Sequence, residues 1–350
     1  MHMADALISP IVGGTMWVAT AGVAAYSIKK IQTEMDEKKV PLMGVMGAFI
    51  FASQMINFSI PGTGSSGHIG GGLILAILLG PYAGFLTMAS VLTIQALFFA
   101  DGGLLALGSN VFNMGFFTCF IAYPLIYKTF MKKGYSTRRI LIASLFTAII
   151  GLQLGAFGVV LETLFSGKTE LPFGTFLLLM QPIHLAIGAV EGLVTAAVVT
   201  YIWNSRPEII EKAASGEALG NVAIRKVIGG LVIVAMITGA GLSWFASSDP
   251  DGLEWAMINT AGTAELEAPE GLHQTLLNLQ SKIAFLPDYS FKASGNEPEP
   301  GVGEGGDAWP AISGGTSAAG LVGGGMTLLL AAFMGFGISM LKKRKNKVSI

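Results

Sequence analysis

The sequence predicts an all-α integral membrane protein, and three features of its composition lead to that prediction. Of the 350 residues, 52% are hydrophobic and only 12% are charged, whereas a soluble chain carries about 25% charged residues. Long apolar stretches recur, and several reach or approach the roughly 20 residues that cross a bilayer as a helix. Glycine is abundant, with 47 residues, which suits close helix packing in lipid. We expect about seven helices in a first module, followed by two helices that flank an external loop.

The apolar stretches predict nine membrane spans. They run roughly over 8–28, 41–58, 69–80, 82–99, 105–127, 139–165, 174–203, 227–247 and 319–341. The third and fourth are short and are separated only by Gly80 and Pro81, so a helical hairpin and a tilted pair fit them equally well. The lone cysteine, Cys119, lies in an apolar stretch. The sequence therefore offers neither a disulfide framework nor a cysteine metal cluster.

Four clusters of basic residues set the expected orientation. They follow the first, fifth, seventh and ninth predicted spans, so with nine spans all four lie on one side of the membrane. The positive-inside rule assigns that side to the cytoplasm. We therefore expect a multi-pass protein of the cell membrane with its C-terminus in the cytoplasm. Its N-terminus is expected outside, beside the loops at 59–68 and 100–104.

The same pattern divides the chain into three parts. Residues 1–205 form the predicted seven-span module, 206–226 a basic cytoplasmic linker, and 227–350 a two-span module. The second module holds an external loop at 248–318 with eleven acidic residues against two lysines. The end of this loop, GNEPEPGVGEGGDAWPAISGG, is rich in Gly and Pro and is expected to be mobile.

The first two residues, Met1 and His2, are expected to belong to the working site and not to a leader peptide, because no basic region precedes the apolar stretch. A free α-amine has an unperturbed pKa of about 7.7–8.0 and an imidazole one of about 6.5, so both can be neutral nitrogen donors near pH 7. The amine, the amide nitrogen of His2 and its imidazole can close two fused chelate rings. His68, in the Gly-rich run IPGTGSSGHIGGGL, could add the fourth nitrogen of the square-planar site that Ni(II) and Cu(II) favour. A frayed terminus is the alternative interpretation.

Several runs resemble the CbiM/NikM family, the substrate-capture membrane subunits of energy-coupling-factor (ECF) transporters for cobalt and nickel. They are MHMADALISP, SIPGTGSSGHIGGGL, QPIHLAIGAVEGLVT and, most specifically, ALFFADGGLLALGSNVFNMG. The resemblance covers about residues 1–205. It implies that the N-terminus inserts into the helical core and that the metal is held by Met1, His2 and His68. One departure is MADAL at 3–7, where the family more often has an Ile-Pro-Asp-Gly-Phe type of sequence, which we expect to alter how the N-terminal segment is held.

The second module carries a resemblance of its own. SDPDGLEWA at 248–256 and LPDYSF at 286–291 are similar to the PDGLE-type small component that accompanies nickel and cobalt members or is fused to them. The resemblance implies a natural fusion in which the second module assists metal loading or gating. The implied partners are a transmembrane coupling subunit, ATPase subunits and membrane lipid, with no nucleic acid. The run SGKT at 166–169 is no phosphate-binding loop, because the motif needs a glycine where Glu162 stands.

Polar side chains inside the predicted spans need internal partners in lipid. Gln95, Asp101, Asn110 and Asn113 are expected to orient the metal ligands, with plain helix-to-helix contacts as the alternative. Asn110 and Asn113 are three residues apart, so they should share a helix face. His184 is expected to pack in the core or to support the site.

Three further ionisable residues have separate interpretations. Glu191 is seven residues from His184 in the same predicted span, so both lie on about the same helix face, and an ionisable group inside the membrane is a functional candidate. Glu162 is expected at the membrane interface. His273 is expected to be a solvated loop side chain, with a metal-loading role as the alternative.

The sequence therefore predicts high-affinity capture and import of a divalent transition metal, with Ni²⁺ favoured, by the substrate-specific subunit of an ATP-driven transporter. The metal is the transported substrate, and no prosthetic group is expected. Uptake of Co²⁺ by the same mechanism and a metal-sensing or assembly protein that does not transport are the alternatives. Enzymatic activity is not expected, because the sequence carries neither a HExxH nor a Gly-x-Ser-x-Gly motif.

Overall fold

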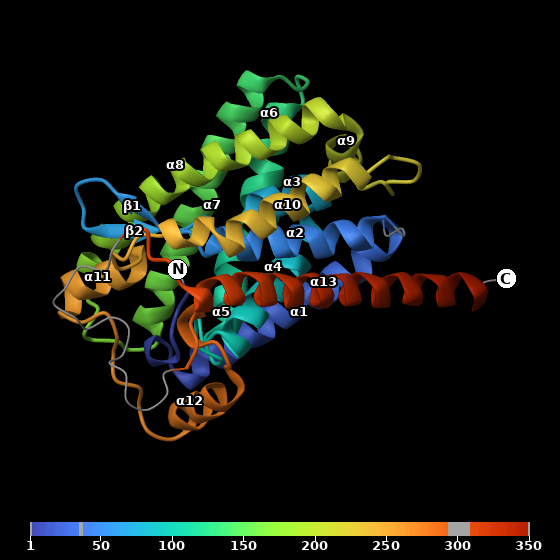
Figure 1. Ribbon diagram of the computed structural model, residues 1–350. Coiled ribbons are helices and arrows are strands. Elements are labelled where there is room, and N and C mark those ends of the chain that lie inside the picture. The colour runs from blue at the N-terminus through green and yellow to red at the C-terminus, as the bar shows by residue number, and fades with distance from the viewer. Residues whose placement is uncertain (1, 35–37, 293–308, 349–350) are drawn as a thin grey trace.

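The structure is a computed structural model that describes residues 2–34, 38–292 and 309–348, and this part of the chain is mostly helical (Figure 1). The α-helices are α1 (Pro10–Glu34), α2 (Lys39–Gln54), α3 (Gly72–Leu79), α4 (Pro81–Phe98), α5 (Leu107–Val111), α6 (Lys128–Met131), α7 (Thr137–Phe165), α8 (Phe173–Ser205), α9 (Pro207–Ser215), α10 (Arg225–Ala240), α11 (Gly252–Ala261), α12 (Leu272–Ile283) and α13 (Gly314–Val348). The expected mobile segment at 295–315 lies largely outside the described residues.

Short elements complete the chain. A π-helix, η2 (Phe112–Tyr127), joins α5 to α6, and the described residues also form three 3₁₀ turns, η1 (Asp5–Leu7), η3 (Leu242–Phe245) and η4 (Pro287–Tyr289). The strands β1 (Phe58–Ile60) and β2 (Ser65–Gly67) form an antiparallel hairpin in which Phe58 pairs with Gly67. The all-α fold class is confirmed, with this hairpin as the exception in the described chain.

Six helical segments of the described chain are long and apolar enough to cross a membrane, by length and composition. They are 10–32, 81–98, 107–131, 137–165, 173–205 and 314–342. Three predicted spans are shorter than expected, because α2 and α10 have 16 residues each and α3 has 8. A 16-residue helix rises about 24 Å, less than the hydrocarbon core of about 30 Å. In the described chain six of the nine expected spans are therefore long enough to cross the hydrocarbon core as one helix, and 69–80 was already expected to be short.

The shorter helices end where the backbone turns while the sequence stays apolar. The helix α2 ends at Gln54, and the apolar residues that follow it enter the β1–β2 hairpin. The helix α10 ends at Ala240, beside Gly241, and continues only as the 3₁₀ turn η3. Hydropathy counts apolar side chains and does not detect such turns, so both spans were predicted too long.

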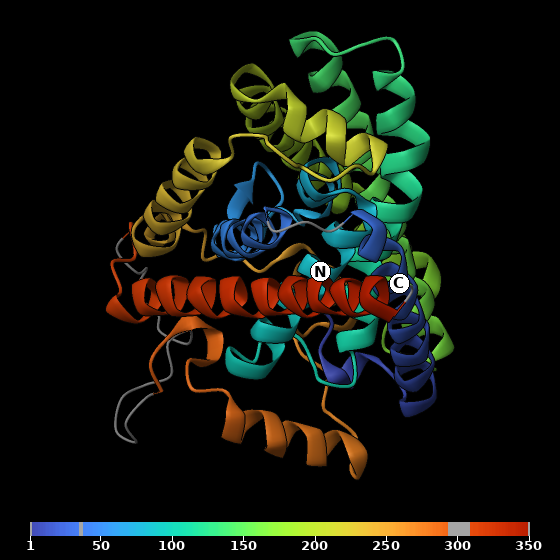
Figure 2. The same ribbon diagram turned by 90° about the vertical axis from the view of Figure 1, so that its right-hand side faces the viewer.

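The second module packs along the first through glycines. The helix α13 lies against α2 and α4, and α10 lies against α2 (Figures 1 and 2). A Cβ atom on Gly44 of α2 would come within 2.8 Å of the Leu328 carbonyl oxygen in α13, and one on Gly320 of α13 would come within 2.3 Å of the Gly239 carbonyl oxygen in α10. The glycines therefore let the helices approach closely, as the composition indicated.

The predicted external loop at 248–318 is partly helical. The helix α11 packs against α8 and β2, and α12 packs against α4 and η1. In both views α12 lies on the far side of α13 from α10 (Figures 1 and 2). The described part of this region is therefore folded against the first module, at the end of the bundle that holds the N-terminal residues.

Candidate metal centre

The first described residues form an arm that inserts into the protein. We call residues 2–8 the N-terminal arm; its Met3 and Ile8 side chains are fully buried. The Met3 amide donates to Asn110 Oδ1 at 2.8 Å, and Asn110 Nδ2 donates to the Met3 carbonyl at 3.1 Å. The amide of Gly103 also donates to that carbonyl at 2.9 Å. The arm is therefore paired with α5 and with the loop before it.

Asp5 fixes the middle of the arm. Its side chain is 1% exposed, and its Oδ1 accepts a hydrogen bond from the Ala106 amide at 3.0 Å. Burial raises the pKa of this carboxyl group. A Cβ atom on Gly103 would lie 1.9 Å from Asp5 Oδ1, so the backbone at 103 approaches the carboxylate as only a glycine permits. The end of the arm is held from the second module, because His273 Nε2 donates to the Ile8 carbonyl at 2.9 Å.

A second irregular segment carries His68. We call residues 68–71, between β2 and α3, the His68 loop. The buried carboxylate of Glu191 accepts the Gly70 amide at 2.7 Å and the Gly71 amide at 3.1 Å. Gln54 Nε2 donates to the Gly70 carbonyl at 2.8 Å, and Gln95 Nε2 donates to Gln54 Oε1 at 2.8 Å. Side chains from α2, α4 and α8 thus fix the loop.

The arm and the loop bring two imidazole rings together. His2 and His68 are stacked, with ring centroids 5.1 Å apart and an interplanar angle of 17°. His68 Nδ1 lies 3.0 Å from the Ile69 carbonyl oxygen. Because a carbonyl only accepts hydrogen bonds, Nδ1 carries the proton and Nε2 keeps a free lone pair.

The environment keeps both rings neutral. Burial lowers the pKa of His2, and it lowers the pKa of His68 to about 3. His2 Nδ1 lies 3.2 Å from Asp101 Oδ1, while its Nε2 is buried and has no hydrogen-bond partner among the described residues. Two neutral imidazoles are therefore available as nitrogen donors. Met1 lies outside the described residues, and its amine stays a prediction.

Three of the predicted supporting residues lie close to this pair. Asp101 contacts His2 and also accepts a hydrogen bond from the Tyr289 hydroxyl. Asn110 holds the arm, and Gln95 supports the His68 loop through Gln54. The structure therefore brings Gln95, Asp101 and Asn110 to the two segments that carry the histidines.

Asn113 is the exception among these residues. Its Nδ2 donates to Glu162 Oε2 at 2.9 Å, and Glu162 is buried rather than at an interface as we had expected. The two asparagines separate because the π-helix η2 begins at Phe112. A π-helix pairs residues i and i+5, so a three-residue spacing no longer keeps two side chains on one face.

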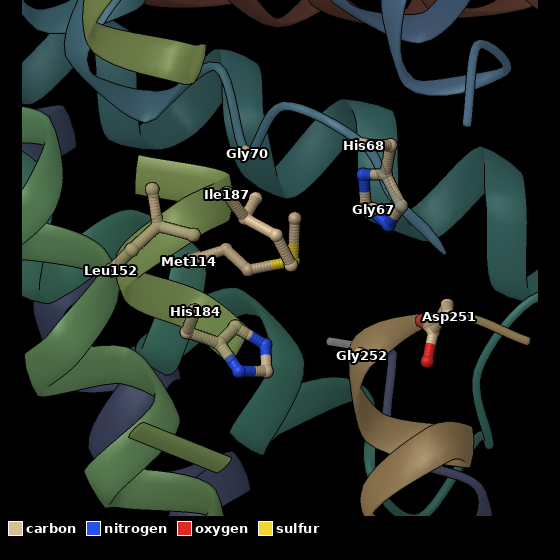
Figure 3. A pocket seen from close by; sticks show the side chains of 9 residues that line it. All are labelled: Gly67, His68, Gly70, Met114, Leu152, His184, Ile187, Asp251 and Gly252. Carbon is tan, nitrogen blue, oxygen red and sulfur yellow. The ribbon is translucent and has the colours of Figure 1, made fainter. Parts of the chain in front are cut away.

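His184 lies beside the candidate centre. Among the described residues, it forms no hydrogen bond with His2 or with His68. Its Nδ1 donates to the Met180 carbonyl at 2.8 Å, and its buried Nε2 has no partner among the described residues. It lines a cavity of about 10 Å³ that His68 and Asp251 also line (Figure 3). This is room for no more than one water molecule, so the position supports packing around the centre.

Several contacts from the second module were not predicted from the sequence. The Ser66 amide donates to the Pro250 carbonyl at 2.8 Å, and Ser66 Oγ donates to the Asp249 carbonyl at 2.7 Å. His273, expected to be solvated, is 3% exposed. The acceptors in the first two contacts are backbone carbonyl groups. The position of a backbone carbonyl cannot be predicted from the pattern of side chains in the sequence. The capping box of Asp251 and Glu254 was the one usable signal, since it marks a helix start in the predicted loop.

A hollow of about 850 Å³ opens between the two modules beside the stacked rings. His2 and His68 line it together with six carboxylates, which are Asp5, Asp101, Asp251, Glu254, Glu265 and Asp288. None of the described residues that line it is Lys or Arg. A concave surface with charges of one sign concentrates ions of the opposite sign, so this hollow favours cations.

The helical bundle and the paired histidines define a multi-pass membrane protein with a candidate metal centre. The chain belongs to the family described as the cobalt uptake substrate-specific transmembrane region, whose model matches residues 2–209. Residues 225–340 match the PDGLE domain. The resemblance to a CbiM/NikM component fused to a PDGLE-type part is thereby confirmed.

Relatives named as fused nickel transport proteins match most of the chain. The chain is 36% identical over 290 residues to a putative fused nickel transport protein NikMN of Archaeoglobus fulgidus, covering 83% of this chain and 88% of that one. It is 30% identical to the fused nickel transport protein NikMN of Rhodobacter capsulatus, with the same coverage. A crystal structure of a truncated transition metal transporter matches with a TM-score of 0.52 and 31% identity, covering 59% of this chain and 99% of that one. The chain is thus a transport protein and not an enzyme, as predicted.

Proposed function

We propose that this protein captures a divalent transition metal ion, Ni²⁺ in preference to Co²⁺, as the substrate-specific subunit of an ATP-driven ECF importer. The observation that carries the proposal is the stacking of two neutral imidazoles, His2 and His68, at the inserted end of the N-terminal arm. The names of the fused nickel transport relatives support nickel.

The proposed ligands are the Met1 amine, the amide nitrogen and imidazole of His2, and the His68 imidazole. In His2 the chelating ring nitrogen is Nδ1, because it is nearer to the backbone amide, and the ion would displace the proton that Nδ1 directs at Asp101 Oδ1. In His68 it is Nε2, whose lone pair is free while Nδ1 donates to Ile69. Four nitrogens in one plane suit Ni(II). Binding displaces protons from such ligands, so the affinity should fall at acid pH.

The ion would reach this centre through the acidic hollow between the modules. We place the N-terminus and the hollow outside and the C-terminus in the cytoplasm, with 1–205 as the metal-binding module, 206–226 as the linker and 227–350 as the small-component module. The carboxylates that line the hollow support this route, although salt limits their attraction to about 8–10 Å. Release to the cytoplasm requires breaking the chelate, and we assign the energy for this step to ATP hydrolysis in the partner subunits.

Cobalt is the second candidate, because the matched family is described as a cobalt uptake region and Co²⁺ can use the same ligands. A metal-sensing or assembly protein that does not transport is the third. Co-purification of the chain with an ATPase, followed by metal uptake into proteoliposomes driven by ATP, separates transport from sensing.

The direct test compares the purified protein with a variant extended by one residue before Met1. Mass spectrometry first establishes that the unextended chain begins with an unblocked Met1, and a variant extended by one residue after Ile350 is the matched control. Ni²⁺ and Co²⁺ are titrated in parallel. Because removal of a supporting partner already costs about 10–100-fold in metal affinity, the N-terminal extension should cost more than about 100-fold.

Each alternative has a distinct result. If the N-terminally extended protein binds Ni²⁺ as tightly as the unextended protein, the amine is not a ligand and the proposed chelate is wrong. If the unextended protein binds Co²⁺ more tightly than Ni²⁺, the preference for nickel is wrong and the capture of a transition metal stands.

A further inference from the structure

We propose that Gln280, in the second module, positions the N-terminal arm for metal binding by holding the peptide group between Gly102 and Gly103. Gln280 is 5% exposed and lies in the last turn of α12. Its Nε2 donates to the Gly102 carbonyl at 2.7 Å and to the Ala96 carbonyl at 2.8 Å. Carbonyl groups only accept hydrogen bonds, so the NH₂ end of the side chain faces them. The inference rests on the proposed function, because it concerns that same metal centre.

One peptide group joins Gln280 to the arm. The Gly102 carbonyl and the Gly103 amide belong to the same planar unit. The carbonyl accepts from Gln280, and the amide donates to the Met3 carbonyl at 2.9 Å. A hydrogen bond to the carbonyl polarises the unit and strengthens its amide as a donor. Gln280 therefore acts on the residue that follows His2 through the backbone of the first module.

This peptide group needs a partner outside its own loop because both of its residues are glycines. Gly103 has to be glycine for its close approach to Asp5, and Gly102 has a φ of 81°, in the left-handed region that favours glycine. Glycine also adopts other backbone conformations readily, so a peptide group between two glycines can rotate. Such a rotation would turn the Gly103 amide away from Met3. The hydrogen bond from Gln280 keeps the peptide plane in the orientation that the arm requires.

The loop after α4 supports the same interpretation. Ala100 has a φ of 56°, which non-glycine residues seldom adopt and which persists where surrounding contacts over-determine it. The Ala96 carbonyl lies in the last turn of α4, where carbonyls have no partner within the helix. Gln280 binds this carbonyl at the start of the loop and the Gly102 carbonyl near its end. One side-chain amide thus spans the loop and fixes its two ends relative to each other.

The helix α12 holds the arm at two points. His273 and Gln280 are seven residues apart, about two helical turns, so they share a face. His273 donates to the Ile8 carbonyl at the end of the arm, whereas Gln280 holds the peptide group that binds Met3 near its start. None of these hydrogen bonds uses a proposed ligand nitrogen. The contacts of α12 and the bound ion can therefore be present together, and the arm is held in advance of binding, which lowers its ordering cost.

The experiment uses the full chain in detergent and has two readouts. Hydrogen exchange of the metal-free protein, measured by mass spectrometry, follows the peptides that contain Met3 and Gly103. The dissociation rate of Ni²⁺ into an excess of chelator follows the metal centre. Gln280→Met keeps the length of the side chain and removes its donors. The matched control is Gln274→Met on the same helix, because Gln274 is exposed and donates to the Ala268 carbonyl of its own module.

We expect the peptides with Met3 and Gly103 to exchange about tenfold faster in Gln280→Met than in the wild type, because two hydrogen bonds are lost. Ni²⁺ should also dissociate about tenfold faster. Its visible absorption band should keep its wavelength, since the ligands are the same. Peptides from α7 should exchange at the wild-type rate, and Gln274→Met should match the wild type in both readouts. Partial unfolding would instead lower the number of ions bound per chain and leave the dissociation rate of the folded chains unchanged.

Three results would overturn the inference. Wild-type exchange of the Gly103 peptide in Gln280→Met would show that Gln280 does not hold the peptide group. Equal acceleration in α7 would show that Gln280 supports the fold as a whole, and wild-type dissociation of Ni²⁺ would show that metal binding does not depend on it. These results leave the proposed function intact. If the wild type itself fails to bind Ni²⁺, the proposed function fails together with the role of Gln280 in metal binding, and the exchange rates still decide whether Gln280 holds the arm.

Discussion

The two segments that carry the paired histidines are held in different ways. The N-terminal arm is fixed by single hydrogen bonds and by a close steric fit, with Asn110 and Gly103 from the first module and His273 from the second. The His68 loop is joined to β2 before it and to α3 after it, and one buried carboxylate, that of Glu191, accepts two of its amides.

This difference shows where the candidate centre is vulnerable. The position of the arm depends on contacts that are individually weak and on a backbone approach that tolerates no added atom. The loop is covalently anchored on both sides, so the loss of one hydrogen bond should move it less. Changes that displace the arm should therefore lower metal affinity most, and the loss of a single peripheral contact should lower it least.

The largest effect is expected from Gly103→Ala. The added Cβ would lie 1.9 Å from Asp5 Oδ1 and 2.4 Å from the Asp5 amide nitrogen, so the arm must shift. Ligand groups need to stay within about 0.5 Å of their productive positions, and we expect Ni²⁺ affinity to fall by more than about 100-fold. Isothermal titration of the purified protein measures this. The control is Gly22→Ala in α1, where an added Cβ meets nothing within 4 Å.

Wild-type Ni²⁺ binding by Gly103→Ala would show that the fit of the arm does not govern the metal centre. The N-terminal arm would then be no more sensitive to displacement than the His68 loop. Weak binding by Gly22→Ala as well would point to a general loss of folding instead.

Asn110→Leu should have the next largest effect. It keeps the branching and the number of heavy atoms of the side chain and removes both hydrogen bonds to Met3. A buried peptide amide left without a partner costs about 1–3 kcal/mol, which corresponds to about 10–100-fold in Ni²⁺ affinity. Asn113→Leu is the matched control, since Asn113 pairs with Glu162 away from the arm. It should lower the Tm and leave the affinity unchanged, and equal affinity losses in both variants would contradict the assignment of Asn110 to the arm.

The contrast between these asparagines also shows what the sequence could predict. Both were recognised as buried polar groups that need partners, and both have them. Their partners differ because the α-helix becomes a π-helix at Phe112. That change could not be predicted from the local sequence. His2 and His68 were recognised because their chelating chemistry and the family resemblance agreed, and the structure brings their rings together.

The second module was predicted less completely for a related reason. Its acidic, Gly- and Pro-rich loop had the composition of a solvated segment, and the helices α11 and α12 were missed. His273 is buried on α12 through contacts with residues more than 200 positions earlier in the chain. Composition describes a segment by itself, whereas such burial depends on which distant surface the segment meets.

Glu191→Gln tests how far the position of the His68 loop depends on the Glu191 carboxylate. The glutamine keeps one acceptor oxygen, and its NH₂ group would face a peptide amide that also donates. Hydrogen bonds to charged groups contribute about 1.5–3 kcal/mol, and part of this loss should reach His68, so we expect about a tenfold loss of Ni²⁺ affinity. Glu208→Gln, at an exposed position of α9, is the control. A loss as large as that of Gly103→Ala would show that the loop is as easily displaced as the arm.

The smallest effect is expected from His273→Ala. It removes one hydrogen bond to the Ile8 carbonyl, and such a bond contributes about 0.5–1.5 kcal/mol, or about two- to tenfold in Ni²⁺ affinity. His273→Gln should restore most of the affinity, because a glutamine amide can donate to the same carbonyl. If His273→Gln binds as weakly as His273→Ala, and both lose as much as Gly103→Ala, then His273 contacts the ion itself. In that case the second module would supply a metal ligand. The bound ion would then position the N-terminal arm more than the hydrogen bonds described above do.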